Sequence, residues 1–167
     1  AQALSVEGRI SEALECTTTL VTHVPGWTDG LKLHAELRWA AGDRARFADH
    51  FESVTALQGA GPAAWRAWCD VLDGVDRHAE SAAVLARARA IWPQDADLAL
   101  AQAVALCEAG QAGDAQELLD EFAAQTGPDW MIARGRNALR LGDPQRAEAA
   151  LDQARAARPG DVAAWAL

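Results

Sequence analysis

The sequence predicts an all-α solenoid of about five antiparallel helix hairpins, and three observations support it. Related residues recur at steps of 34 and 32 positions over almost the whole chain, and a fixed period in this range is typical of repeat proteins. About a quarter of the residues are alanine, the best helix former. Glycine and proline interrupt the apolar stripes at regular intervals, and no alternating strand pattern stands out.

The unit over residues 128–159, PDWMIARGRNALRLGDPQRAEAALDQARAARP, is the best copy of the repeat. Gly142 closes its first helix, because glycine adopts the left-handed cap conformation without steric penalty. Asp143 is expected to cap the second helix, and Pro144 suits its first turn. Small residues at Gly135 and Ala147 would let the two helices approach closely, and Pro159 ends the unit.

Several columns of residues keep this register in the other units. The turn position steps by 34, 34, 34 and 32 residues and holds Gly8, Gly42, Asp76, Gly110 and Gly142. The small residue of the first helix is Ala35, Cys69, Ala103 and Gly135. The crossing position of the second helix is Ala13, Phe47, Ser81, Ala115 and Ala147. A two-residue shortening falls between Ala115 and the Gly127–Pro128 junction.

These columns place the elements in chain order. A remnant helix over 1–6 pairs with a helix over 9–23, and the next hairpin pairs 27–41 with 43–58. The third pairs 62–73 with 76–91, the fourth pairs 95–109 with 111–125, and the fifth is the unit described above. The linkers are only a few residues long, so we expect one domain over 1–167 with incomplete terminal repeats.

The repeat unit resembles the tetratricopeptide repeat. The resemblance lies in the period, the small residue of the first helix, the turn glycine, the alanines of the second helix and the terminal proline. The resemblance covers nearly the whole chain and implies a right-handed superhelical solenoid that acts as a protein-binding scaffold or adaptor. The chain departs from the family pattern at two points. It has no tyrosine, and Phe47 stands where alanine is expected, which predicts a local shift in packing.

Composition excludes several classes of function. The formal net charge is −9, which argues against sequence-independent binding to nucleic acid or anionic lipid. The charge is spread along the chain and is interpreted either as an ordinary solvated surface or as a groove for a partner with basic residues. No apolar run approaches the length of a membrane span. The three cysteines are far apart and suggest no disulfide framework, which fits a reducing, cytoplasmic compartment.

We find no sequence pattern of catalysis. The four histidines, His23, His34, His50 and His78, lack metal-ligand spacing, and there is no phosphate-binding loop or nucleophile motif. Cys69 occupies the small-residue column and is interpreted as a packing residue. The aspartates at 43, 76 and 143 are interpreted as helix caps. We therefore expect no active site, no metal and no cofactor.

In a curved stack of hairpins, the first helix of each pair lines the concave face. Helical spacing selects the residues that point there. The predicted partner-binding residues are Lys32, Glu36, Trp39, Arg66, Asp70, Leu100, Val104, Ile132, Arg136 and Arg140. The first half of this groove would be charged and the second half apolar, with the two arginines at its end.

Trp39 is the best candidate for an exposed recognition aromatic, with burial against the next hairpin as the alternative. Trp65, Trp130 and Trp165, near the starts of first helices, are expected in the core. Members of the resembled family that hold a C-terminal carboxylate use lysines and asparagines on this face. Lys32 and Arg66 stand in suitable places here, but the asparagines are absent.

Two classes of function remain open. The chain is either a protein-interaction module that takes a peptide or a partner helix on its concave face, or the substrate-recruiting repeat region of a larger enzyme, since such repeats are joined to transferase or hydroxylase domains. The second class is favoured by a sixth unit that stops after Trp165. A third interpretation is self-association through the uncapped apolar end at Val162 to Leu167.

Overall fold

The computed structural model describes residues 8–57 and 60–159 of the 167-residue chain. These residues form helices and turns and contain no strand. They divide into two compact units, Ala1–Asp76 and Arg77–Leu167, which are described separately. The predicted remnant helix over 1–6 lies outside the described residues, and so does the apolar end from Val162 to Leu167, with Trp165.

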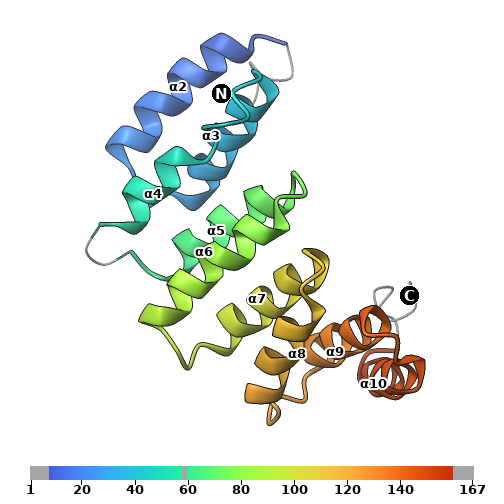
Figure 1. The fold of residues 1–167 in the computed structure, drawn as a ribbon. Helices are drawn as coiled ribbons and strands as arrows, with labels where there is room; N and C mark the ends of the chain where they lie inside the picture. Colours follow the sequence, from blue (N-terminus) through green and yellow to red (C-terminus); the bar gives the residue numbers. More distant parts are fainter. Residues whose placement is uncertain (1–7, 58–59, 160–167) are drawn as a thin grey trace. The chain divides into compact units, whose positions relative to one another are not determined.

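The first unit contains four described helices, α2 (Ile10–His23), α3 (Thr28–Ala40), α4 (Asp49–Thr55) and α5 (Pro62–Asp73) (Figure 1). Helix α3 packs against both α2 and α5, and α4 also packs against α5. The first helices of the second and third repeats therefore lie side by side. Trp65 on α5 is only 4% exposed, in agreement with its predicted place in the core.

The second unit contains α6 (His78–Ile91), α7 (Ala96–Glu108), α8 (Ala112–Glu121), α9 (Pro128–Arg140) and α10 (Pro144–Ala157) (Figure 1). Helix α7 packs against α6, α8 and α9, and α9 packs against α8 and α10. Trp130 is 6% exposed, as predicted. The prediction of an all-α helical-repeat fold is confirmed. The antiparallel pairing of the helices, the hand of the superhelix and the single-domain organisation stay predictions.

All five members of the turn column adopt the left-handed backbone conformation. Their φ angles are 77° at Gly8, 90° at Gly42, 59° at Asp76, 80° at Gly110 and 77° at Gly142. The prediction of a helix cap at Asp76 is therefore wrong: Arg77 is the N-cap residue of α6, and Asp76 replaces the turn glycine. Asp143, by contrast, does cap α10, since its carboxylate accepts a hydrogen bond from the Arg146 amide at 3.0 Å.

The close approach predicted at Gly135 is confirmed. A β-carbon built on this residue would lie 2.7 Å from Leu151 Cγ and 3.4 Å from the Ala147 carbonyl oxygen. Real β-carbons do not approach a neighbour to 2.7 Å, so α9 and α10 could not pack this tightly with a larger residue at 135. The members of the crossing column are equally buried, with Ala147 1% exposed.

The second hairpin departs from the prediction of a helix over 43–58. Helix α4 covers only Asp49–Thr55, and residues 44–48 form turns. Phe47 is the physical reason: its ring is 1% exposed and packs edge-on against Trp39 with centroids 5.0 Å apart. Asp43 stands before these turns and not before a helix. Its carboxylate pairs with the Arg38 guanidinium and also accepts a hydrogen bond from the backbone amide of Arg46.

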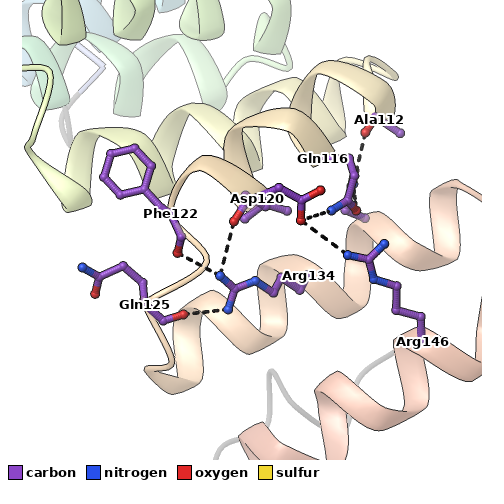
Figure 2. A network of polar contacts seen from close by, with 9 residues as sticks. Ala112, Gln116, Asp120, Phe122, Gln125, Arg134 and Arg146 are labelled. Atoms are coloured by element: carbon purple, nitrogen blue, oxygen red, sulfur yellow. Dashed lines mark hydrogen bonds and ion pairs between the residues drawn. The ribbon is translucent and has the colours of Figure 1, made fainter.

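The two-residue shortening falls at the end of α8, which stops at Glu121 where the periodic pattern predicts helix as far as 125. Arg134 of α9 compensates for the early stop. Its guanidinium donates hydrogen bonds to the carbonyl oxygens of Leu119 at 3.3 Å, Phe122 at 3.0 Å and Gln125 at 2.6 Å (Figure 2). These carbonyls lie at and beyond the helix end, where the regular bonds of the helix stop; the Phe122 carbonyl oxygen also accepts a hydrogen bond from the Gln125 amide at 3.0 Å.

Two histidines lie between helices of the first unit, His34 buried and His50 half-buried. His34 of α3 shares a 2.9 Å hydrogen bond with the Thr17 hydroxyl of α2 through its Nδ1 atom. His50 of α4 donates from Nε2 to the Leu31 carbonyl oxygen at 3.0 Å. The two imidazole rings meet edge-to-face at 4.8 Å. This polar cluster links α2, α3 and α4 inside an otherwise apolar core.

None of the helices in the described ranges is both long enough and apolar enough to cross a membrane.

Candidate functional site

Three of the predicted partner-binding residues meet on the surface formed by α3 and α5. The Lys32 ammonium group pairs with the Asp70 carboxylate across the two helices. These two residues line a hollow of about 330 Å³ together with Arg66, Thr28, Ala63 and Ala67. The Lys32 side chain is 34% exposed and that of Asp70 is 57% exposed, so both charged groups are accessible. We call this the charged hollow.

Glu36 and Trp39 continue the same helix beyond the charged hollow. Glu36 is exposed, one turn after Lys32. Trp39 is half-buried, because its ring packs against Phe47 and the Arg44 guanidinium lies over it at 5.4 Å. The tryptophan is thus partly covered from within its own repeat, and a ligand that stacked on its face would have to displace Arg44.

The remaining predicted residues lie on α7 and α9 of the second unit. Leu100 and Val104 are half-buried, and Ile132 is 8% exposed in a core cluster with Met131 and Ala154. Arg140 pairs with Glu108 at 2.9 Å. Arg136 is half-buried, and its Nε atom is buried without a hydrogen-bond partner. Ile132 is therefore the least accessible of the ten predicted residues.

A second hollow, of about 310 Å³, was missed by sequence reasoning. We call it the apolar hollow. It lies where the end of α4 meets the starts of α3 and α5, and its walls include Val54 and Leu57 from α4 and its C-terminal end, and Ala64 from α5. Thr28 and Ala63 line both hollows, which are therefore contiguous. Helical spacing could have indicated part of this surface. Thr28 and Ala63 each lie one helical turn before a residue of the charged hollow, Lys32 and Ala67 respectively.

The described residues contain no group of three or more histidine, cysteine, aspartate or glutamate side chains that could hold a metal ion. Burial, and secondarily the charge of Glu108, raise the pKa of the Cys107 thiol. A raised pKa keeps a thiol protonated and poorly nucleophilic. Cys69, which the repeat pattern assigns to packing, is 3% exposed.

Comparison with solved structures agrees with the repeat pattern. YrrB, described as a tetratricopeptide repeat protein with an unusual peptide-binding site, superposes with a TM-score of 0.64 at 15% identity, covering 99% of this chain and 86% of that one. TTC0263, a thermophilic tetratricopeptide repeat protein from Thermus thermophilus, gives 0.65 at 18% identity, with coverages of 98% and 91%. MamA from Desulfovibrio magneticus RS-1 gives 0.62 at 19% identity, with coverages of 96% and 92%.

The fold is that of tetratricopeptide repeat proteins. The agreement spans nearly the whole chain at 19% identity or less, so it concerns the arrangement of the backbone. No family model matches the sequence, and no curated protein matches it either. The tetratricopeptide repeat fold therefore rests here on the register of the repeat columns and on the structural superposition.

Proposed function

We propose that this chain is a protein-interaction scaffold that binds a peptide or a partner helix on the surface formed by the first helices of its hairpins. The observation that carries the proposal is the charged hollow. Lys32 from one repeat and Arg66 and Asp70 from the next line one accessible depression. Solenoid proteins build their extended binding surfaces from residues of neighbouring repeats.

Two further observations support this proposal. YrrB, which shares the fold, is described as having a peptide-binding site. The Lys32 and Asp70 side chains are 34% and 57% exposed, so a partner can reach both charged groups of the charged hollow.

The experiment that tests the proposal is selection of binders from a displayed library of random peptides, followed by charge reversal on the chain. We expect Lys32→Glu and Arg66→Glu each to weaken binding of the selected peptides by about threefold or more, on the order of the energy of an exposed ion pair. Arg146→Glu on α10 is the matched control, because its side chain is exposed and belongs to the other unit.

Circular dichroism of each variant establishes that the helices remain intact. The proposal is overturned if no peptide is enriched, or if Arg146→Glu weakens binding as much as the two substitutions in the charged hollow do. The same scan extended to Arg136→Glu tests whether α9 of the second unit contributes to binding.

A further inference from the structure

Helix α4 is short, and a titratable side chain joins it to α3. It is the shortest helix in the described part of the chain, seven residues long, and residues 44–48 before it form turns. It packs against α5, where the Phe51 ring stacks on Trp68 with centroids 6.2 Å apart. Its link to α3 includes the hydrogen bond from His50 Nε2 to the Leu31 carbonyl oxygen at 3.0 Å. A short element at the edge of a fold can open locally without unfolding of the whole unit.

The hydrogen bonds of the histidine pair determine where its protons lie. A carbonyl oxygen only accepts, so neutral His50 carries its proton on Nε2 and its Nδ1 atom is unprotonated. This Nδ1 atom is buried and has no hydrogen-bond partner among the described residues. The Thr17 hydroxyl donates to carbonyl oxygens of α2 and therefore accepts from His34 Nδ1. A second proton on His50 would have to go to Nδ1, where none of the described groups accepts it.

The surroundings of His50 also oppose its positive charge. Burial is the largest cause of its lowered pKa of about 4, and His34 and Arg38 of α3 lower the pKa further. Asp49 of its own helix acts in the opposite direction. Helix α5 faces α4 with the uncharged Trp68 ring, and α2 reaches the histidine pair through an uncharged hydroxyl. If α4 moves into water, the burial is removed and the pKa of His50 returns to about 6.5.

We propose that α4 is a proton-operated element: uptake of a proton by His50 opens α4 away from α3 and α5 while the other helices of the first unit stay folded. Val54 and Leu57 move with α4, so the apolar hollow loses two of its walls. The opening also uncovers the Phe51 ring, which is fully buried in the closed form, and the Trp68 ring on which it stacks. Acidification thus replaces a small aliphatic depression by an exposed aromatic surface. This inference goes beyond the proposed function and does not depend on it, because the opening needs no partner.

Amide hydrogen exchange of the full chain at several pH values tests the inference. Dividing each rate by that of an unfolded peptide at the same pH leaves the equilibrium constant for opening. From pH 7 to pH 5 we expect this constant to rise about twentyfold for α4, because the pKa of His50 changes from about 4 to about 6.5 on opening. Exchange in α4 should depend little on low concentrations of urea, since local opening exposes little surface, whereas exchange in α3 should depend on urea strongly.

His50→Gln removes the titratable group and keeps an N–H donor for the Leu31 carbonyl oxygen. The pH effect on α4 should then fall below about fivefold, with His34 as the remaining titratable member of the pair. His23→Gln, at an exposed position of α2, is the matched control and should retain the full effect. Because any substitution at position 50 changes the packing beside Phe51, the His50 ring is also followed by nuclear magnetic resonance in the unmodified chain. It should titrate near pH 4 and carry its neutral-form proton on Nε2.

Three results would overturn the inference. They are an equal urea dependence of exchange in α4 and α3, a full pH effect that persists in His50→Gln, and a His50 ring that titrates at about pH 6.5 or above, its value in an unfolded chain. Each of these results leaves the proposed function untouched, since peptides selected from the random library can still bind the α3 and α5 surface. The proposed function fails separately, when the library itself yields no binder.

Discussion

Gly135 shows how one residue sets the distance between two helices. A β-carbon at this position would overlap Leu151 Cγ at 2.7 Å, and the neighbouring Ala147 carbonyl oxygen belongs to the backbone and cannot rotate away. Alanine is the better helix former by about 1 kcal/mol, but overpacking a tight contact costs about 1–3 kcal/mol. The steric term is the larger of the two.

We therefore expect Gly135→Ala to lower the free energy of unfolding by about 1–2 kcal/mol, measured by urea denaturation. Gly113→Ala is the control, because Gly113 lies within α8 and a β-carbon there meets nothing within 4 Å. That substitution should raise stability by up to about 1 kcal/mol. Equal effects at the two glycines would contradict the close-approach argument.

The histidine pair of the first unit makes its stability depend on pH. Burial lowers the pKa of His50 to about 4 and also lowers the pKa of His34, with the Arg38 guanidinium as a smaller cause in both cases. In the unfolded chain both pKa values return to about 6.5. Because the folded pKa values are below the unfolded ones, the unfolded state binds protons first as the pH falls.

The free energy of unfolding of the first unit should thus be highest above about pH 6.5. It should fall between pH 6.5 and 4, by on the order of 2–3 kcal/mol for His50. Urea denaturation at pH 7 and pH 5 measures the change. His50→Gln keeps an N–H donor for the Leu31 carbonyl and should flatten the pH dependence. The control His23→Gln, at an exposed position, should leave the dependence as it is, and an equal effect of both variants would refute the explanation.

At the scale of elements, Arg134 acts as a side-chain cap for a helix in the preceding hairpin. Three carbonyl oxygens at the end of α8 accept its hydrogen bonds (Figure 2), and its guanidinium also lies 5.8 Å from the Trp130 ring centroid. Burial lowers the pKa of this guanidinium. An arginine satisfies several acceptors with one planar group, whereas a lysine ammonium is a compact point donor.

Arg134→Ala should lower the free energy of unfolding by about 2–3 kcal/mol, the range for hydrogen bonds that involve a charged group, and Arg134→Lys should recover only part of the loss. Arg146→Ala is the control, since its ion pair with Asp120 spans 3.5 Å between exposed side chains and is worth less than about 1 kcal/mol. Hydrogen exchange of the α8 amides measures where the loss occurs. Uniform loosening of all helices would argue against a cap.

The sequence predicted the bounds of some helices well, and those of α4 and α8 poorly. Helix α5 has the predicted bounds of 62–73, and α9 and α10 lie within the predicted hairpin. The failure at α4 comes from Phe47, because a large ring in a column of small residues must find space that the period does not describe. Asp76 was predicted both in the turn column and as a helix cap, and the turn is what the structure has, since aspartate is common both in caps and in left-handed turns.

At the scale of the whole molecule, helical spacing indicated that Lys32, Arg66 and Asp70 share one surface, and the three residues do line one hollow; their role in binding stays a prediction. It could not indicate the apolar hollow, which depends on where α4 ends and on the alanines of α5 leaving space. Nor could spacing distinguish Ile132, which is buried, from its half-buried neighbours on the predicted face. Periodicity predicts which side a residue faces, whereas a cavity depends on the volume of every side chain around it.

The net charge of −9 acts on a partner over a longer range than the two hollows do. A negatively charged chain attracts basic segments before contact, while the local charges of the charged hollow act on the partner only at contact. The screening length is about 30 Å at 0.01 M salt and about 3 Å at 1 M. The two effects can thus be separated by salt alone.

We expect a peptide selected from the random library to bind more tightly when lysines flank it than when glutamates do, by on the order of tenfold at 0.01 M salt. The ratio of the two dissociation constants should approach one as salt rises toward 1 M, because flanking residues act only through the screened field. The loss of affinity on replacing an apolar residue of the selected peptide by alanine should remain at every salt concentration, since apolar burial is not screened. If the two flanked peptides bind equally at low salt, the net charge plays no part in choosing the partner.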